Sequence, residues 1–456
     1  MAVWCNTTLS EISLNRRIDS EFFRPFYIKT ESTVLDGNKV IMLGKVGKFI
    51  IGPFGSAFHV SNYEVKSNYR YIRGKDVKPF QLLDDDNVYI PEDDYNRLSR
   101  YSISENDLII SVVGTIGNVS IIPEGEKGIF SCKSTIFREI NIDPYFLLGY
   151  LNSKYGRTCL LRRQRGAIQM GLNLEDLNKV PVPIFPKSTM VAIGNLIRQG
   201  LKLNQESKLL YSQSTQMLEK ELGLDKVNLE NRLYYSTKIS NIITGKRTDS
   251  QNLQPKFENL ISHLKNHFTC NLLGLMSSVN RRGTQPIYDA NGTKNIINSQ
   301  HITSTHLKYE NFEKTTSSEF GLHPEAHVQY GDILVYTTGA YVGQTNAYLQ
   351  YEPALASNHV NILRLKKDVD PAYVALVLNT LIGKTQTEKH IRGSAQAELY
   401  PNDLAKFIIP LLDKSIMTEI GDFVRDSLQV LIESKKLLEQ AKSEVETLIE
   451  QAANKS

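Results

Sequence analysis

Two pairs of histidines in this sequence have the spacing of a helical zinc site. His263 and His267 are four residues apart, as are His323 and His327. Residues i and i+4 lie on one face of a helix, which is how zinc proteases present their first two ligands. Neither pair has the glutamate that follows the first histidine in those proteases, or the downstream cysteine pair of zinc deaminases. The sequence therefore predicts no metal site.

Two further motifs resemble fragments of catalytic sites. Gly383–Thr385 is similar to the end of a phosphate-binding loop, but the glycine required five positions earlier is replaced by Leu378. Asp143–Phe146 (DPYF) is similar to the Asp-Pro-Pro-Tyr motif of adenine methyltransferases, but it lacks one proline, and the second copy reads DPAY from Asp370. Aspartate followed by proline is typical of a helix start, which explains both copies. We therefore expect no catalytic centre in this chain.

Two long segments contain the kinds of side chain that recognise nucleic acids. Ile51–Lys78 and Asn280–Lys308 are punctuated by glycine and rich in Lys, Arg, Asn, Gln, Ser, His and Tyr. Such side chains reach phosphates and base edges. Ordinary polar surface loops have a similar composition, so composition by itself leaves both interpretations open.

A second group of basic residues supports the same hypothesis, although arginines on a solvated helix face would also explain it. The group contains Arg157, Arg162, Arg163 and Arg165, with a weaker counterpart at Lys384, Lys389, His390 and Arg392. From side-chain chemistry we predict the following DNA-binding residues: Ser56, His59, Tyr63, Lys66, Arg70, Arg73, Lys75, Arg163, Arg165, Arg281, Arg282, Gln285, Lys294, Gln300, His301 and Arg392. We predict no catalytic and no metal-binding residue.

The segments that must position these residues occur twice. Arg17–Tyr27 reads RIDSEFFRPFY and Arg247–Phe257 reads RTDSQNLQPKF, with Arg, Asp, Ser, Pro and an aromatic residue at matching places. Further matches follow in the same order: YIRGKDV with IINSQHI, NDLIISVVGTIG with GDILVYTTGAYVG, DPYFLLGYLNS with DPAYVALVLNT, and RGAIQMGLNLEDL with RGSAQAELYPNDL. These units are too long for a solenoid array, so we predict two copies of one large unit.

Each copy divides into a lead segment, a mixed region and a long helix. The β-branched runs DLIISVV and DILVYTT predict strands in the two mixed regions. We place the boundaries as follows: a lead segment at 1–37, a mixed α/β domain at 38–185, a long helix at 186–226, a second lead segment at 227–264, a second mixed α/β domain at 265–412 and a second long helix at 413–456.

Both long helices have heptad spacing. In the second, the apolar or small positions are Met417, Ile420, Val424, Ser427, Leu431, Ser434, Leu438, Ala441, Val445 and Leu448. In the first, they are Leu196, Leu203, Leu210 and Met217, each followed by Ile197, Asn204, Tyr211 and Leu218. This spacing favours a two-helix coiled coil over a helix packed only on its own domain. We expect the helices to set the distance between the mixed domains.

Composition sets the broad class. The chain has 456 residues, 41% hydrophobic and 22% charged, which suits a globular protein of two or three domains. No apolar run is long enough to span a bilayer, and the first residues do not resemble a signal peptide. The four cysteines are scattered, which is typical of a reducing compartment, so we expect a cytoplasmic protein. A net charge of +4 permits a nucleic-acid partner without requiring one.

Taken in order, these motifs resemble the specificity (S) subunit of type I restriction-modification systems. The resemblance covers essentially the whole chain. It is carried by the duplicated lead segments, by GPFGSAFHVSNY at Gly52–Tyr63, by the GD-strand-GxxG turns, and by RGxxQ followed by a proline-ending strand and a long helix.

The resemblance implies an α+β fold with two target-recognition domains in a pseudo-twofold repeat, separated by two long antiparallel coiled-coil helices. It implies a non-catalytic subunit in which each domain reads one half of a bipartite site in double-stranded DNA. Two modification subunits, which bind S-adenosylmethionine and methylate adenine, would dock on the chain and bring in ATP-dependent restriction subunits. No cofactor is expected on this chain and no membrane partner. Two alternatives stay open: a coiled-coil assembly protein that binds no DNA, and a catalytic restriction or methylation enzyme.

Overall fold

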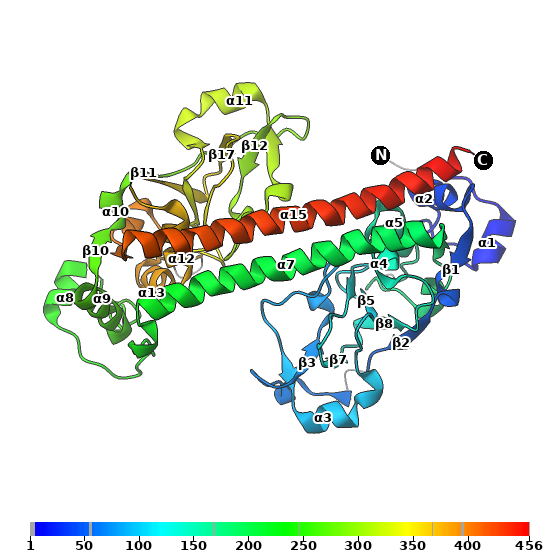
Figure 1. Cartoon of the computed structure of the whole chain (residues 1–456), viewed down its shortest axis with the longest axis horizontal. Coiled ribbons are helices and arrows are strands. Elements are labelled where there is room, and N and C mark those ends of the chain that lie inside the picture. Colours follow the sequence, from blue (N-terminus) through cyan, green and yellow to red (C-terminus); the bar gives the residue numbers. More distant parts are fainter. Residues whose placement is uncertain are drawn as a thin grey trace. The chain divides into compact units, whose positions relative to one another are not determined.

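A computed structural model describes residues 5–53, 57–166, 169–245, 247–366, 368–393 and 396–455 (Figure 1). It divides into two compact units. Unit 1 consists of Met1–Asn204 and Ile432–Ser456, and unit 2 is Gln205–Leu431. The two long helices are α7 (Lys187–Glu221) and α15 (Lys414–Ala453), and each unit contains part of both. Each predicted mixed domain is therefore grouped with segments of the long helices of both copies.

Unit 1 combines two small sheets with short helices. The strands are β1 (Val40–Met42), β2 (Lys48–Ile51), β3 (Tyr69–Ile72), β4 (Tyr89–Ile90), β5 (Leu108–Ser111), β6 (Val119–Ile121), β7 (Gly128–Phe130), β8 (Ser134–Arg138) and β9 (Pro181–Pro183). The helices are α1 (Leu9–Asn15), α2 (Pro25–Leu35), α3 (Glu92–Arg97), α4 (Pro144–Asn152), α5 (Lys154–Arg162) and α6 (Leu174–Leu177). One sheet has the order β2-β8-β5-β6 and the other β4-β3-β7, while β1 and β9 form a two-stranded pair.

Unit 2 has a similar order of elements, with one additional short strand, β14, before β15. Its strands are β10 (Thr269–Leu272), β11 (Ser277–Arg282), β12 (Lys294–Ile297), β13 (Glu313–Thr315), β14 (His327–Val328), β15 (Ile333–Tyr336), β16 (Thr345–Ala347), β17 (Ala354–Ala356), β18 (Val360–Leu365) and β19 (Ile408–Leu411). Its helices are α8 (Ile239–Gly245), α9 (Pro255–His267), α10 (Leu273–Met276), α11 (Ser317–Leu322), α12 (Pro371–Asn379), α13 (Leu381–His390) and α14 (Pro401–Leu404). The sheets run β11-β18-β15-β16 and β13-β12-β17-β14, with β10 paired to β19.

The two sheet topologies correspond except at β14, whose place in unit 1 is taken by a single bridge between Ser102 and Ile129, and this correspondence confirms the predicted α+β repeat. In both copies the run after an Asn-Asp or Gly-Asp pair is a buried strand, β5 or β15. Each of these strands pairs antiparallel on both sides, β5 with β6 and β8, and β15 with β16 and β18. Among the described residues, no helix is both long and apolar enough to cross a lipid bilayer.

A buried helix forms the centre of each unit. The Asp143 carboxylate caps α4 by accepting hydrogen bonds from the backbone of Tyr145 and Phe146, and Asp370 caps α12 in the same way. The DPYF and DPAY motifs are therefore helix starts, as predicted. The apolar side chains of α4 pack against those of α7 and α15 in unit 1, and α12 packs against both long helices within unit 2.

Each of these caps is also tied to a long helix. Arg198 of α7 forms an ion pair of 2.6 Å with Asp143, and Arg425 of α15 forms one of 2.9 Å with Asp370. A glycine lies one turn before each arginine, where a Cβ atom would come within 2.5 Å of Asp143 or 2.3 Å of Asp370. The two copies thus use the same joint between buried helix and long helix.

The long helices meet along a seam of small residues. In unit 2 the hydroxyl of Ser207 donates to the carbonyl of Ser427 at 2.7 Å, and the hydroxyl of Ser427 donates to the carbonyl of Ser207 at 2.8 Å. In unit 1 the Ser434 hydroxyl donates to the Gly200 carbonyl at 2.6 Å. Such contacts require the two backbones to lie close together, which small side chains allow.

The predicted heptad of α15 agrees with this seam, but that of α7 needs a correction. The four residues Leu196, Leu203, Leu210 and Met217 are only partly buried. Three residues of the series that begins at Ile197 are buried instead, together with small residues between them. The buried positions of α7 include Ile193, Ile197, Gly200, Asn204, Ser207, Ser214 and Leu218. Glycine and serine at the seam have no apolar signature, so the larger leucines beside them dominated the sequence pattern.

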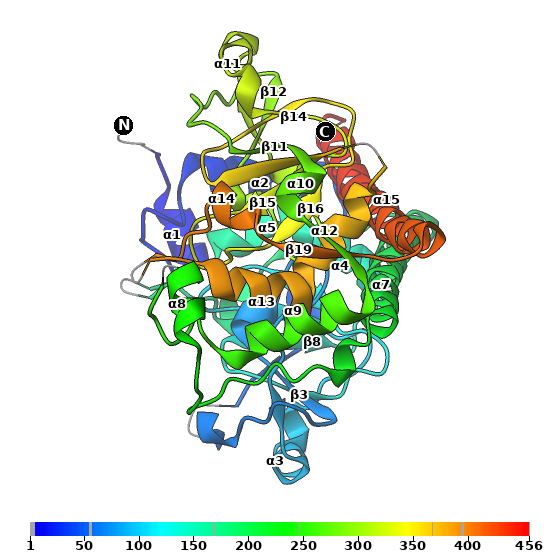
Figure 2. The same ribbon diagram turned by 90° about the vertical axis from the view of Figure 1, so that its left-hand side faces the viewer.

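The repeated lead segment holds the end of a helix. Arg17 pairs with Asp19 at 2.8 Å and donates to the carbonyls of Arg163 and Gln164, just past the end of α5. Arg247 pairs with Asp249 at 2.7 Å and donates to the carbonyls of Lys389 and Ile391 at the end of α13. The last carbonyls of a helix lack backbone partners and carry negative charge, which a guanidinium neutralises. Figure 2 shows α13 beside α9, the helix that follows this motif in unit 2.

We predict that Arg17→Ala destabilises the chain more than Arg247→Ala does. The Arg17 side chain is 3% exposed and that of Arg247 is 26% exposed, and only Arg17 donates to a carbonyl in a buried contact, that of Arg163. Expected losses in the free energy of unfolding are about 2 and about 1 kcal/mol, respectively. Hydrogen exchange should quicken at the end of α5 in the first variant and of α13 in the second. Unchanged exchange at both helix ends would contradict the capping role.

Candidate nucleic-acid interface

Several loops of unit 1 meet at one edge of its sheets. A Cβ atom on Gly52, after β2, would lie 2.4 Å from the Ser131 carbonyl, and one on Gly74 would lie 2.9 Å from the Lys133 side chain. The Thr115 hydroxyl donates to the Gly74 carbonyl at 3.4 Å. We call this group the loop edge of unit 1 and define it by the following residues: Gly52, Gly74–Asp76, Thr115 and 131–133.

Unit 2 has the equivalent edge. A Cβ atom on Gly283 would lie 2.1 Å from the Ala356 carbonyl. The Thr337 amide donates to the His359 carbonyl at 3.1 Å, as Val112 donates to Lys133 at 2.9 Å in unit 1. The loop edge of unit 2 is defined by the following residues: Gly283–Thr284, 298–300, Thr337–Gly339, 357–359 and Glu398.

Lys133 and His359 occupy equivalent exposed positions just before β8 and β18, and the sequence prediction missed both. They follow the matched triplets Ser-Cys-Lys and Ser-Asn-His, each leading into a strand. The match between the triplets could have identified both residues. It was overlooked because the triplets lie outside the two glycine-rich segments. Both side chains have the chemistry of a phosphate or base contact.

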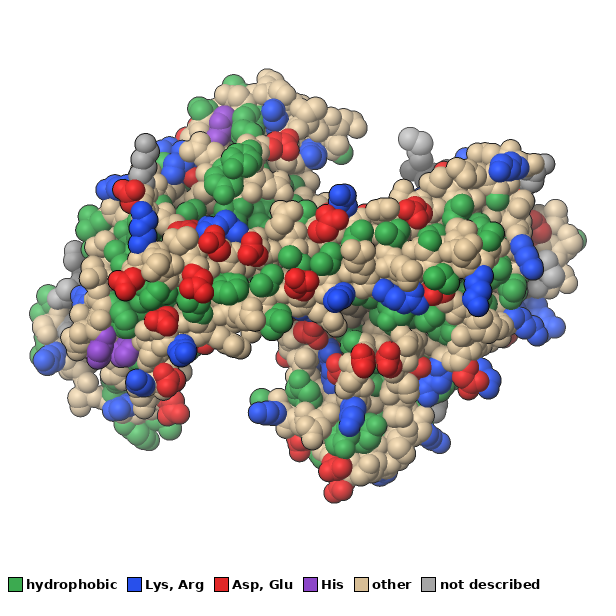
Figure 3. Space-filling view, viewed as in Figure 1, with side chains coloured by type: hydrophobic (Ala, Val, Ile, Leu, Met, Phe, Trp, Pro, Cys, Tyr) green, Lys and Arg blue, Asp and Glu red, His purple; other side chains and the backbone are tan. Residues whose placement is uncertain are grey.

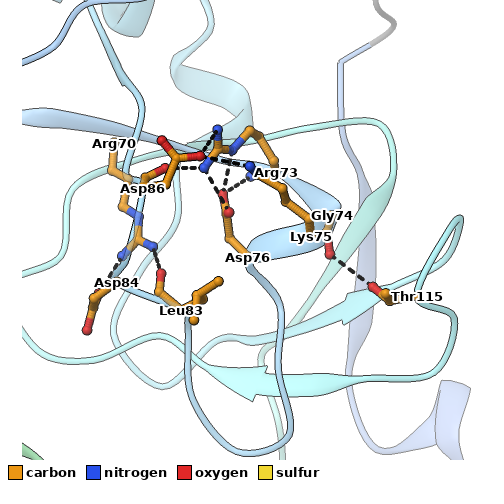
Figure 4. A network of polar contacts seen from close by, with 9 residues as sticks. All are labelled: Arg70, Arg73, Gly74, Lys75, Asp76, Leu83, Asp84, Asp86 and Thr115. Atoms are coloured by element: carbon orange, nitrogen blue, oxygen red, sulfur yellow. Dashed lines mark hydrogen bonds and ion pairs between the residues drawn. The ribbon is translucent and has the colours of Figure 1, made fainter. Parts of the chain in front are cut away.

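A network of charged residues that includes Arg73, Lys75, Asp76 and Asp86 is shown in Figure 4. The Asp76 carboxylate accepts from the Arg73 backbone amide at 2.8 Å and from its guanidinium at 3.0 Å. This pair caps the short helix of residues Gly74–Asp76, and the equivalent cap in unit 2 is made by Asn298 and His301. Burial would lower the pKa of Arg73, but the Asp76 carboxylate outweighs it and the pKa is raised. Lys75 lies on the same turn with its side chain 58% exposed.

Predicted residues of the first glycine-rich segment lie near this network. Tyr63 belongs to an aromatic group with Phe58 and Tyr71, at centroid distances of 5.6 and 5.5 Å, and burial raises its pKa. His59 is exposed and its ring lies 2.7 Å from the Ser61 hydroxyl. Lys66 is exposed on the turn before β3, whereas Ser56 lies outside the described residues.

Three predicted contacts lie in the interior, and we remove them from the candidate interface. Arg70 is 2% exposed and donates to the Leu83 carbonyl and to Asp84. Arg163 is 5% exposed and makes a two-pronged ion pair with Glu31 of α2. His301 is 2% exposed, and burial lowers its pKa to about 4, so the ring is neutral. Their internal partners explain these polar residues without DNA.

Two other predicted arginines close loops while staying accessible. Arg165 forms a two-pronged pair with Asp176, and Arg392 forms one with Asp403, at the same spacing in both copies. The side chains are 36% and 53% exposed, respectively. Their main role is therefore to fix the RGxxQ loops, and one edge of each guanidinium remains open to a ligand.

Unit 2 brings together two predicted arginines from distant segments. Arg282 pairs with Glu398 at 2.7 Å, and its guanidinium lies 5.0 Å from the ring centroid of Tyr400. Arg392 lies 6.0 Å from the same ring. Lys294 lies apart from them, 5.5 Å from the Phe320 ring. The remaining predicted residues of this unit are exposed: Arg281, Gln285 and Gln300.

Neither histidine pair forms a metal site. His263 lies 2.7 Å from the Leu222 carbonyl, and His327 lies 2.7 Å from that of Phe320. Across the described part of the chain, no group of three or more His, Cys, Asp or Glu side chains is placed to hold an ion. On the face shown in Figure 3, Lys and Arg side chains are interspersed with Asp and Glu over each unit, in keeping with the small net charge.

Comparison with known proteins supports the sequence resemblance. Residues 275–446 match the family described as type I restriction modification DNA specificity domain. No curated protein matches the sequence. The chain is similar to the type I restriction-modification S subunit from M. genitalium at 12% identity and a TM-score of 0.46, covering 91% of this chain and 95% of that one. It is similar to the HsdS subunit from Thermoanaerobacter tengcongensis at 14% identity and a TM-score of 0.28, covering 92% and 96%.

We predict that Arg70→Met lowers stability by about 2 kcal/mol at neutral pH, because it removes a buried guanidinium that pairs with the partly exposed carboxylates of Asp84 and Glu126. The pKa of Glu126, which lies 3.8 Å from Arg70, is already raised by burial and would rise further. A raised pKa favours the protonated carboxyl in the folded state, so stability falls as the pH rises above the ordinary glutamate value.

The loss measured by denaturant unfolding should therefore be smaller at pH 4.5 than at pH 7. Lys66→Met, which removes the same charge from an exposed position, serves as the control. Equal effects of the two substitutions would contradict the interior role of Arg70.

Proposed function

We propose that this chain, which carries a type I restriction modification DNA specificity domain in residues 275–446, is the specificity subunit of a type I restriction-modification complex. One observation carries the proposal beyond the matched residues. Apart from the edge strand β14, which unit 1 replaces with a single bridge, unit 1 repeats the sheet topology of the matched unit, including the capping aspartate and its arginine. A domain whose function is DNA specificity is thus present as two structural copies in one chain.

Each copy reads one half of a bipartite target in double-stranded DNA. The copies differ where a loop edge would face a ligand: Lys75 corresponds to Gln300 and Lys133 to His359. A lysine neutralises a phosphate or binds guanine, whereas glutamine suits adenine. Divergent side chains on equivalent backbone positions support two different half-sites.

The chain has no catalytic role of its own in this proposal. Adenine methylation and its S-adenosylmethionine belong to two modification subunits, and ATP-dependent cleavage belongs to restriction subunits recruited through them. A duplicated chain suits two identical partners, because it offers the same surface twice. Exposed apolar residues recur at one position of the lead segments, Leu9 of α1 at 84% and Ile239 of α8 at 74% exposure.

Exchange of one domain tests the proposal directly. Replacing residues 265–412 with the corresponding domain of a relative should change one half of the methylated DNA motif and leave the other half intact. The readout is the methylation motif of genomic DNA in cells that also express the modification subunits. A motif altered in both halves would refute independent reading, and no methylation with any version would favour an assembly protein that binds no DNA.

A second prediction concerns Lys133 at the loop edge. If Lys133 contacts a phosphate, Lys133→Gln should weaken binding to all duplexes about equally and reduce the slope of log affinity against log salt by about one. Fluorescence anisotropy with a labelled duplex at several salt concentrations measures both. Lys48→Gln is the matched control, because Lys48 is 71% exposed and begins β2 at the end away from Gly52. Equal effects of the two substitutions would remove Lys133 from the interface.

A further inference from the structure

Lys75 of the loop edge of unit 1 and the neighbouring Arg73 already share an acidic partner within the chain. Asp86 lies on the loop before β4, with its side chain 71% exposed. Its carboxylate accepts from Lys75 at 2.8 Å and lies 3.4 Å from the Arg73 guanidinium. Arg73 also donates to the backbone carbonyl of Asp86 (Figure 4). One carboxylate oxygen thus engages two cations, as a DNA phosphate oxygen would.

The inner and outer acids of this network have different roles. Asp76 is 3% exposed and holds the backbone and the guanidinium of Arg73, so it fixes the turn. Asp86 makes its contacts from the solvent side. The hydrogen bond from Lys75 lowers the pKa of Asp86, so its carboxylate is charged at neutral pH. Removing the Asp86 carboxylate would therefore free Lys75 and take one of two acidic partners from Arg73, without disturbing the cap that Asp76 makes.

The second copy has the corresponding strand pair and bridge without these charges. The bridges Val77 to Leu82 and Ile302 to Leu307 are equivalent, and four residues beyond each lie Asp86 and Asn311. Gln300 stands where unit 1 has Lys75. The fold therefore needs neither the lysine nor the aspartate here, and an architectural role does not explain why unit 1 has both.

We propose that Asp86 is a specificity-determining residue: it occupies Lys75 and Arg73 in place of a DNA phosphate and so weakens binding of unit 1 to non-cognate DNA. The inference rests on the proposed DNA-reading function. Non-specific binding comes almost entirely from neutralised phosphates, so an internal carboxylate reduces that contribution. An exposed ion pair shifts an equilibrium by no more than roughly fivefold. Base contacts to a correct half-site raise the affinity by roughly tenfold or more, so a correct half-site displaces the carboxylate.

The test compares Asp86→Asn with Asp85→Asn in the full chain. Both remove one negative charge from the same exposed loop, but only Asp86 forms the ion pairs with Lys75 and Arg73. The probe is a labelled duplex pool of random sequence, titrated by anisotropy at several salt concentrations. Asp86→Asn should bind roughly three- to fivefold more tightly than Asp85→Asn and steepen the salt slope by up to about one.

The double variant Lys75→Gln, Asp86→Asn identifies the route of the effect. It should lose most of the gain, because the freed lysine is then absent. Sequencing of the bound pool should also show weaker enrichment of one half of the motif for Asp86→Asn than for the unmodified chain. Thermal unfolding should show equal midpoints for all these variants, since the substituted side chains are exposed.

The outcomes separate two kinds of failure. If Asp86→Asn and Asp85→Asn bind alike, or if the double variant keeps the full gain, the role of Asp86 is overturned while the proposed function stands. If neither the unmodified chain nor any variant binds the duplex pool, alone or with its modification subunits, the proposed function fails and the inference with it.

Discussion

The ion pair between a helix-capping aspartate and an arginine of a long helix is the joint on which each unit depends. Asp143 begins the buried helix α4 and is held by Arg198, and Asp370 begins α12 and is held by Arg425. The sheets pack around these buried helices, and the helices pack against α7 and α15. A glycine of the long helix lets each aspartate approach closely. The ion pair therefore depends both on the arginine side chain and on the absence of a Cβ atom at that glycine.

A second set of pairs fixes the ends of the helix that follows. Arg17 and Arg247 hold the carbonyls after α5 and α13, while Arg165 and Arg392 close the loops that come next. We call the buried helix, the long helices and these polar contacts the frame of each unit. Because the two units have the same frame, the same polar contacts occur in both. The loop edges are free of that requirement, so their side chains can differ between the copies without altering the frame.

Much of the fold was predictable from the sequence, because its signals are local or repeated. The strand before each Gly-rich turn, the helix starts at Asp143 and Asp370, and the heptad of α15 follow from alternation, capping and spacing. The seam of α7 could not be predicted in this way, because Gly200 and Ser207 have no apolar side chain. Their role is to form hydrogen bonds with residues of α15, which the sequence of α7 does not reveal. Lys133 and His359 were missed because folding, not sequence proximity, places them beside the glycine-rich loops.

The candidate site was harder to predict, since a basic residue does not reveal its partner. Arg163 and Glu31 are far apart in the sequence, so the burial of Arg163 could not be read from its neighbours in RRQR. Comparison between the copies provides the missing information. Residues that recur with their partners, such as Arg165 with Asp176 and Arg392 with Asp403, serve the frame. Positions that share a backbone but differ in charge, such as Lys75 and Gln300, are those where the frame leaves the side chain open to selection by a ligand.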